Sequence, residues 1–310
     1  MLELDQNSKT SSDEEQKERV RTFFDHSDSW RGEIYGDQND RFNKAMLRRR
    51  EYALAMLRTH VDSPEGKSVL DIGCGCGAYL EELGKMGMDP YGLDLSPAMI
   101  QECRKRLRVS DEVFSSHFAT GDIEAIPFPA EQFDVVVSIG VFGYLTTDDA
   151  ALEEVWRVLK PGGLFLVSVQ NAMSLSNIDF VLRTRLRRMI AGKKGVGLVD
   201  TSGISVMIPW VTNHSETHHS YKSYNPWKWS ATIEQHGFQQ VDSMTFGQEF
   251  RLFRRLKLIP ESLLTASEIA LDRLFRRARL PYFSQAGESH TGLFRKKEED
   301  NGLHDSWRVV

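Results

Sequence analysis

The sequence predicts an α/β protein, in which a doubly wound, mostly parallel sheet carries helical insertions that form a cap. Between residues 66 and 171, short apolar segments alternate with amphipathic ones, as in parallel strands joined by crossover helices. Glycine or acidic residues follow several strand segments. A chain of 310 residues with 40% hydrophobic content is long enough for one sizeable core with insertions.

Two segments precede this core. Residues 1–16 are rich in Ser, Asp and Glu, and predict a disordered N-terminal tail. Residues 17–65 predict an N-terminal helical arm, because residues 41–60 place apolar side chains among basic ones, as an amphipathic helix does.

The core, residues 66–171, is expected to hold five strands and three helices. Ser96 and Pro97 are typical of a helix start, as cap and first helical residue, and the Pro-Gly-Gly at 161–163 predicts a helix stop. We expect the strands at 67–73, 90–95, 117–120, 133–140 and 163–170, and the helices at 78–87, 96–107 and 148–163.

Beyond the core, Asn225-Pro226 predicts the start of another helix. The predicted divisions are an insertion at 172–226, a core helix and sixth strand at 227–250, a basic helical insertion at 251–288, a last strand at 289–297 and a C-terminal tail at 298–310.

Composition excludes several classes of protein. The net charge of -5 gives no reason to expect nucleic acid as a partner. No apolar run approaches the roughly 20 residues of a membrane-spanning helix, and the first 18 residues lack the pattern of a secretory signal. The three cysteines form neither a paired framework nor a metal pattern, so we expect a cytoplasmic protein without a metal site.

The strongest local signal is the run VLDIGCGCG at residues 69–77. Glycines at alternate positions after a strand let the backbone turn sharply and approach a ligand closely. Taken alone, this run also fits a tight strand-to-helix turn without a ligand, or a dinucleotide-binding turn, although that fingerprint prefers G-x-G-x-x-G.

Two acidic residues decide between these alternatives. Asp94 ends the second strand about twenty residues after the turn, where a carboxylate accepts from ribose hydroxyls. Asp122, after the third strand, is suited to accept from an exocyclic amine, while a neighbouring backbone N–H addresses a ring nitrogen. Together they describe a site for adenosine without a basic clamp for a pyrophosphate. For Asp71 we expect an ammonium partner or a link to the glycine loop.

Four motifs in this order resemble the class I methyltransferases, in particular their small-molecule and lipid-quinone branch. They are VLDIGCGCG, YGLDLSPAMI, GDIEAIPFPAEQFDVVVSIGVFGYL and EEVWRVLKPGGLFLVSV, within residues 66–170. The resemblance implies a seven-stranded Rossmann-like sheet with a reversed last strand, and S-adenosyl-L-methionine as methyl donor.

The resemblance also implies roles for individual residues. The glycine turn approaches the methionine part, Asp94 binds ribose, Asp122 binds the adenine amino group, Leu95 and Ile123 flank adenine, and Ser138 or Ile139 closes the methionine side. The predicted cofactor-binding set is Asp71, Gly73, Cys74, Gly75, Gly77, Asp94, Leu95, Asp122, Ile123, Ser138, Ile139, Trp30 and Tyr35. Trp30 and Tyr35 belong to an aromatic arm similar to the lid of relatives that include the magnesium-protoporphyrin methyltransferases; core packing is the alternative.

The acceptor side is less determined. The segment after the fourth strand, SIGVFGYL, lacks the Asn/Asp-Pro-Pro-aromatic tetrapeptide of enzymes that methylate amide or nucleobase nitrogen. It also lacks the histidine that the porphyrin enzymes have in this segment. His214, His218 and His219 are candidates for a general base, since histidine titrates near neutrality, and Tyr144 is a second candidate. The alternatives are solvated loop histidines and a packed tyrosine.

Two basic stretches, residues 180–194 and 251–280, interleave Arg with Leu, Ile and Phe at near-helical spacing. Such stretches either rest on an anionic membrane surface or form a cap over the sheet. The membrane reading predicts a peripheral protein with a lipid or lipid-linked acceptor.

The sequence therefore predicts S-adenosylmethionine-dependent O-methylation of a small-molecule or lipid-linked, prenylated acceptor. The alternatives are N- or C-methylation of another metabolite, porphyrin-type acids included, a non-catalytic protein that binds S-adenosylmethionine, and a nicotinamide oxidoreductase, which Asp122 and the G-x-G-x-G turn disfavour.

Overall fold

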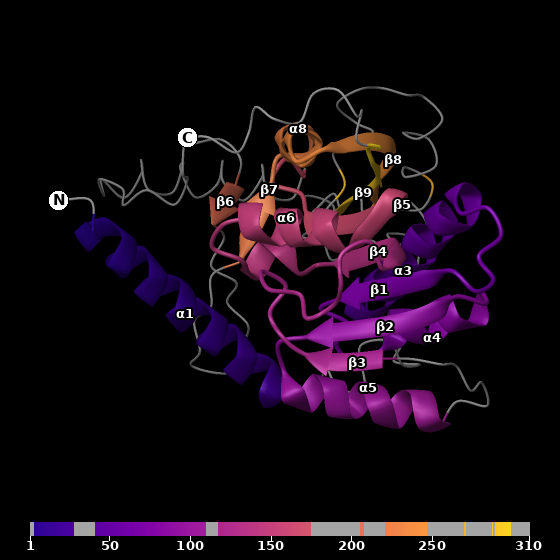
Figure 1. Cartoon of the computed structure of the whole chain (residues 1–310), viewed down its shortest axis with the longest axis horizontal. Coiled ribbons are helices and arrows are strands. Elements are labelled where there is room, and N and C mark those ends of the chain that lie inside the picture. The colour runs from indigo at the N-terminus through magenta and orange to yellow at the C-terminus, as the bar shows by residue number, and fades with distance from the viewer. Residues whose placement is uncertain are drawn as a thin grey trace, which may run out of the picture.

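The computed structural model describes residues 3–27, 41–109, 117–174, 205–207, 221–246, 270, 287 and 289–298. Within them, one sheet has seven strands in the order β3-β2-β1-β4-β5-β9-β8, and β6 and β7 form a separate pair (Figure 1). The strands are β1 Ser68–Ile72, β2 Asp89–Asp94, β3 His117–Thr120, β4 Phe133–Ile139, β5 Leu159–Gln170, β6 Ser205–Met207, β7 Lys222–Tyr224, β8 Phe238–Phe246 and β9 Ser289–Lys296.

The direction of the strands confirms the fold class. Strands β1 to β5 of the main sheet pair in parallel, whereas β9 lies antiparallel to both β5 and β8. The sheet is therefore mostly parallel with one reversed strand, as the resemblance implied. Reversal of the last strand, and its insertion between β5 and β8, place the start of β9 at the carboxyl ends of the parallel strands.

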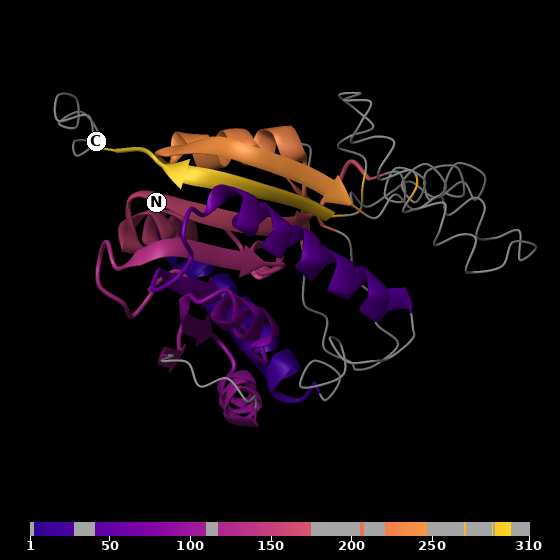
Figure 2. The ribbon, with the colours of Figure 1, turned by 90° about the vertical axis from the view of Figure 1, so that its right-hand side faces the viewer.

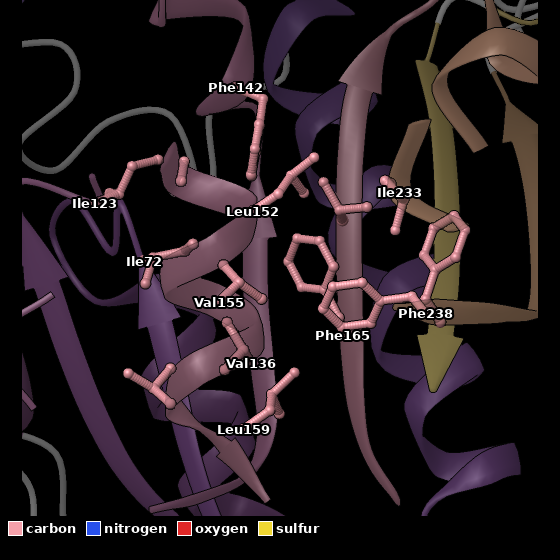
Figure 3. Packing of buried hydrophobic residues seen from close by; sticks show 14 of the residues in the cluster. Ile72, Ile123, Val136, Phe142, Leu152, Val155, Leu159, Phe165, Ile233 and Phe238 are labelled. Atoms are coloured by element: carbon pink, nitrogen blue, oxygen red, sulfur yellow. The ribbon is translucent and has the colours of Figure 1, made fainter. Parts of the chain in front are cut away.

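Helices cover both faces of the sheet. One hydrophobic cluster joins α6 and α8 to β1, β4, β5 and β9 through residues such as Leu152, Phe165 and Ile233 (Figure 3). A second cluster joins α3 and α4 to the opposite face, and Figure 2 shows the sheet between these layers. The described helices are α1 Glu3–Asp25, α3 Arg41–His60, α4 Ala78–Lys85, α5 Pro97–Val109, the short 3-10 helix η1 Phe142–Tyr144, α6 Asp149–Val158 and α8 Pro226–Gln235.

Local sequence explains where α8 begins, and a contact from β9 lies at the end of α6. The side chain of Asn225 accepts from the backbone N–H groups of Trp227 and Lys228, with Pro226 at the first turn, as predicted. Helix α6 ends at Val158, and β5 begins at Leu159, before the Pro-Gly-Gly; the buried Lys296 donates to the carbonyls of Trp156 and Leu159 there, at 2.8 and 2.7 Å. The helix is therefore shorter than the predicted 148–163.

The N-terminal tail prediction was wrong for most of its length. The structure has a helix, α1, from Glu3 to Asp25, where a disordered segment was expected at residues 1–16. Polar composition hid this helix, because α1 has little apolar surface of its own. It is anchored by polar and aromatic contacts to distant segments, such as Lys17 with Asp122 and Phe24 with Tyr144, which a local pattern does not reveal.

Candidate functional site

The glycine turn links β1 to the end of β2. The backbone N–H groups of Gly73 and Cys74 both donate to the carbonyl of Leu93, at 2.7 and 3.0 Å. Gly73, Gly75 and Gly77 have positive φ angles of 75°, 51° and 81°, a region that side chains with a Cβ rarely adopt. The turn therefore requires glycine for its backbone conformation at all three predicted positions.

The three glycines differ in what surrounds them. A Cβ on Gly73 would lie 2.2 Å from Cγ2 of Val141, and one on Gly77 would lie 2.6 Å from Sγ of Cys103. A Cβ on Gly75 would have no heavy atom within 4 Å. Gly73 and Gly77 thus permit close packing, whereas Gly75 borders open space in which a ligand can approach the backbone.

Asp94 lies at the end of β2 beside this open space. One carboxylate oxygen accepts from the backbone N–H of Gly75 at 2.8 Å, and the other accepts from the backbone N–H of Ser96 at 2.9 Å. Burial raises the pKa of Asp94 to about 6, although both hydrogen bonds act in the opposite direction. The carboxylate is thus fixed in orientation next to the glycine turn.

Asp71 is 2% exposed at the end of β1. Burial and the neighbouring carboxylate of Asp94 raise the pKa of Asp71 well above its usual value. A ligand cation beside Asp71 would stabilise its charged form. This agrees with the ammonium partner expected for Asp71, and that role stays a prediction.

Asp122 begins the loop after β3. Its Oδ1 accepts from the backbone N–H of Glu124 at 3.0 Å, and its Oδ2 lies 2.6 Å from Nζ of Lys17 on α1. The Lys17 ammonium also pairs with Glu124. The structure therefore brings Asp122 to the same sheet edge as Asp94, and it adds a partner from α1 that the sequence did not suggest.

The remaining predicted cofactor residues divide into two groups. Leu95 and Ile139 are half-buried at the sheet edge, and Ile139 packs against the second hydrophobic cluster. Ile123 and Ser138 are 5% and 0% exposed; Ile123 packs in the core cluster of α6, and Ser138 Oγ has no hydrogen-bond partner among the described residues. Because both side chains are buried, a contact of Ile123 with adenine, or of Ser138 with methionine, would involve backbone atoms.

The cysteines of the turn are buried thiols. Cys74 and Cys103 lie side by side, and their contact together with burial raises the pKa of Cys74. Burial also raises the pKa of Cys76. Neither thiol is poised for reaction near neutral pH. In the part of the chain that the structure describes, no three His, Cys, Asp or Glu side chains gather as a metal site would require.

Tyr144 ends the 3-10 helix η1 after β4. Its ring packs edge-on against Phe24 of α1 at 5.5 Å and against Tyr221 at 4.7 Å. Burial raises the pKa of Tyr144 far above that of a free phenol. A phenolate is therefore not accessible near neutral pH, so Tyr144 is poorly suited to act as a base.

Several predicted residues lie outside the described ranges. These are Trp30, Tyr35, His214, His218 and His219, together with the basic stretches 180–194 and 251–280 apart from Ala270. Among the helices that are described, none has the length and hydropathy needed to cross a membrane.

The structure also shows residues that sequence reasoning missed. Arg49 of α3 reaches the end of β4, where a Cβ on Gly140 would lie 3.1 Å from its Nη1. His290, on β9, is 2% exposed and pairs in register with Val169 of β5, one residue before that strand ends. No pattern signals either residue, because Arg49 is one of several arginines on α3 and His290 lies between the polar residues Ser289 and Thr291.

Comparison with known proteins agrees with this geometry. Residues 70–167 match a family described as "Methyltransferase domain". A malonyl-[acyl-carrier protein] O-methyltransferase of Serratia marcescens is 34% identical over 116 residues, which cover 37% of this chain and 43% of that protein. A fatty-acid O-methyltransferase of Mycolicibacterium smegmatis is 38% identical over 104 residues, 33% of this chain and 36% of its own length. The chain thus spans less than half the length of either relative.

Among solved structures, the fold is similar to magnesium protoporphyrin IX methyltransferase from Synechocystis PCC 6803 with bound SAH. The TM-score is 0.58 at 16% identity, over 91% of this chain and all of that one. This similarity concerns the fold. Residues 70–167 thus match a methyltransferase domain, and the strand order with its reversed last strand agrees with the fold of this neighbour.

Proposed function

We propose that this protein is a methyltransferase that uses S-adenosylmethionine, and that it methylates oxygen of a small-molecule or lipid-linked acceptor. The observation that supports S-adenosylmethionine as the cofactor is the hydrogen bond between Asp94 and the backbone of Gly75. It fixes a carboxylate beside open space at a glycine turn, with Asp122 on the next strand's loop. Ribose hydroxyls and an adenine amino group are the donors that such a pair of carboxylates would accept from.

The residues present fit this cofactor. The open space at Gly75 leaves room for the ligand to contact the backbone, and the carboxylate of Asp71 would attract the cofactor's ammonium group. Arg49, beside Gly140, is our candidate for its carboxylate. When bound, the cofactor supplies an electrophilic methyl group on a sulfonium.

The chain's own contribution is to position the acceptor oxygen and to remove its proton where needed. The buried edge around Tyr144 and Tyr221 would exclude water from this step. His214, His218 and His219 are retained as candidate bases for a hydroxyl acceptor. An acceptor with a carboxylate needs no base, and the two curated relatives named above are O-methyltransferases of acyl compounds.

The first test is titration calorimetry with S-adenosylhomocysteine (SAH) and, separately, with NAD⁺. We expect binding of SAH in the micromolar range or tighter and no binding of NAD⁺. The reverse result would support an oxidoreductase and contradict the proposal.

The second test asks for the acceptor. Transfer of labelled methyl from the cofactor into fractionated cell extract should place label in organic-soluble material, and the label should be released by base if it is an ester. Label that resists base would be a methyl ether or a methyl group on carbon or nitrogen, and its release as methyl iodide by hot hydroiodic acid would distinguish the ether from a methyl group on carbon. Binding of SAH without any transfer would favour a non-catalytic protein.

The basic stretches 180–194 and 251–280 support the lipid-linked alternative within this proposal. Co-sedimentation with vesicles of anionic and of neutral lipid at low salt tests it. We expect recovery with the anionic vesicles only, and equal recovery with both would remove the argument for peripheral membrane contact.

A further inference from the structure

The loop after β3 is bound to an ion pair of α6. This loop begins at Gly121 and carries Asp122, our candidate acceptor for the adenine amino group. Within α6, Glu154 and Arg157 form two parallel contacts, Oε1 with Nε at 2.7 Å and Oε2 with Nη2 at 2.8 Å. A carboxylate and a guanidinium that meet through two bonds are held in one relative orientation. The pair is therefore a rigid attachment point on the helix.

The same two side chains reach the backbone of the loop. Oε2 of Glu154 accepts from the backbone N–H of Ile126 at 2.6 Å. Arg157 donates from Nη2 to the carbonyl of Ile126 and from Nη1 to the carbonyl of Phe128, at 2.8 Å each. The backbone carbonyl of Arg157 also accepts from the N–H of Glu131 at 2.9 Å. Both backbone polar groups of Ile126 are thus bound to the ion pair.

Ile126 lies directly after the turn that orients Asp122. The backbone N–H of Ala125 donates to the carbonyl of Asp122 at 3.1 Å, and Oδ1 of Asp122 accepts from the N–H of Glu124. Ile123 and Ile126 are 5% and 4% exposed and belong to the hydrophobic cluster of α6, in which Figure 3 labels Ile123. A displacement of Ile126 would therefore move the carboxylate of Asp122.

The ion pair is charged but only partly buried. The hydrogen bonds from Arg157 hold the pKa of Glu154 below its usual value, although burial acts in the opposite direction. The side chains of Arg157 and Glu154 are 35% and 20% exposed. Because partly exposed ion pairs contribute little to the free energy of unfolding, we expect the effect of this pair mainly on the position of the loop.

We propose that Glu154 and Arg157 are positioning residues that set the adenine selectivity of the nucleoside site: they hold Asp122 where its carboxylate accepts from the 6-amino group. Both act through the loop backbone. This inference rests on the proposed function, because it takes the nucleoside of S-adenosylmethionine as the ligand. A purine with a carbonyl oxygen at the same position, as in inosine, offers an acceptor in place of a donor, so a correctly placed carboxylate disfavours it.

The test is titration calorimetry of the full-length chain with SAH and, separately, with S-inosyl-L-homocysteine, in which a carbonyl oxygen replaces the 6-amino group. We expect the unaltered chain to prefer SAH by about thirtyfold, because only SAH donates to the carboxylate. Arg157→Met removes the ion pair and both bonds to the loop carbonyls, and it should lower this preference to about threefold, mainly by weakening SAH. In Asp122→Asn the preference should be low already, and adding Arg157→Met should not lower it further.

Glu154→Gln is a milder variant of the same pair. Its amide oxygen can still accept from the N–H of Ile126, but the charge that holds Arg157 is lost. The preference for SAH should therefore fall to an intermediate value of about tenfold. If Arg157→Met does not fold, Glu154→Gln alone decides between the same outcomes.

Lys160→Met is the matched control. Lys160 pairs with Asp134 at 2.7 Å, near the starts of β5 and β4 and so at the opposite end of the parallel strands. The two side chains are 42% and 24% exposed, close to the values of the pair on α6. This variant should affect thermal unfolding about as much as Arg157→Met and should keep the full preference for SAH.

A ratio of the two affinities that stays unchanged in Arg157→Met would overturn the inference, whether both ligands bind as before or both bind more weakly. An equal loss of preference in Lys160→Met would overturn it as well, because general loosening of the fold would then suffice. Equal binding of the two ligands by the unaltered chain would mean that Asp122 does not recognise the amino group, and would leave the cofactor assignment intact. Absence of SAH binding in the unaltered chain would instead contradict the proposed function.

Discussion

The two halves of the sheet's carboxyl edge are built from different chemistry. At β1, β2 and β3 the edge carries the carboxylates Asp71, Asp94 and Asp122, and the backbone reaches open space at Gly75. At β4, β5 and β9 it carries the phenols Tyr144 and Tyr221, with His290 buried in the core.

This difference separates two tasks. The acidic half offers acceptors at fixed positions and suits a ligand rich in hydroxyl and amino donors. Among the described residues, the aromatic half carries Arg49 and an ion pair between Lys222 and Asp148, whose charges offset each other at 2.9 Å. A single sheet edge can therefore bind a common cofactor in one half and an acceptor that differs between relatives in the other. The following predictions test that division.

The largest effect is expected at Gly73 in the acidic half. Gly73→Ala forces a Cβ against Val141 at a positive φ, so the free energy of unfolding should fall by about 3 kcal/mol and SAH binding should be lost. Thermal unfolding and calorimetry measure the two effects.

Gly75→Ala is the matched control for Gly73→Ala. Its Cβ meets no protein atom within 4 Å, so only the backbone cost of about 1 kcal/mol is expected in stability, whereas SAH binding should still weaken strongly. If Gly75→Ala bound SAH normally, the open space beside the turn would not belong to the ligand.

The aromatic half should respond to pH through His290. Burial lowers the pKa of His290 to about 4, so the folded state resists its protonation more than the unfolded state does. The unfolded state binds more protons between about pH 4 and 6.5. His290 therefore contributes stability above pH 6.5 that is lost as the pH falls toward 4, by up to about 3 kcal/mol.

His290→Leu should remove this pH dependence and be at least as stable at pH 7, because both ring nitrogens of His290 lack partners among the described residues. Chemical unfolding at pH 5 and pH 7 compares the two proteins. A large loss of stability in the variant at pH 7 would mean that the imidazole has a partner.

Asp94→Asn should weaken SAH binding by about 1–3 kcal/mol at pH 7.5, because the ribose hydroxyls lose a charged acceptor. In the unaltered protein, affinity should fall as the pH drops through about 6, where Asp94 becomes protonated. Calorimetry between pH 5 and 8 measures both, and the variant should show a flat profile.

The same group has the opposite effect on the ligand-free fold. Its folded pKa is raised above the unfolded value, so the neutral form stabilises the protein below about pH 4, and that contribution is lost as the pH rises through 6. If the affinity of the unaltered protein for SAH did not change between pH 5 and 8, Asp94 would not contact the ligand.

The smallest effect is expected for Tyr144→Phe. The ring contacts with Phe24 and Tyr221 remain, so stability should change by less than about 1 kcal/mol. Methyl transfer into the labelled fraction should stay within about threefold, with the same pH profile. A loss of one limb of that profile would restore Tyr144 as a proton-transfer group.

Sequence reasoning predicted the acidic half much better than the aromatic half. Hydrophobic periodicity predicts the strands at 67–73, 90–95 and 117–120. The glycine turn, Asp94 and Asp122 directly follow or end these strands, so their positions follow from the strand boundaries. The structure confirms these strands to within two residues.

The rest depends on contacts between distant segments. The ion pairs of Lys17 lie over a hundred residues from their partners in sequence, and Arg49 comes from the N-terminal arm to the end of β4. Ser138 lies within β4 and Ile123 follows β3, as expected, but both side chains are buried in the interior. Local pattern carries no information about any of these.

The reversed strand β9 has a consequence for the segment that precedes it. Phe246 at the end of β8 pairs in register with Ser289 at the start of β9, so the chain leaves the sheet and rejoins it at adjacent positions. The register of all seven strands is therefore independent of the number of residues between these two points, and a change of length there leaves every strand with its partners.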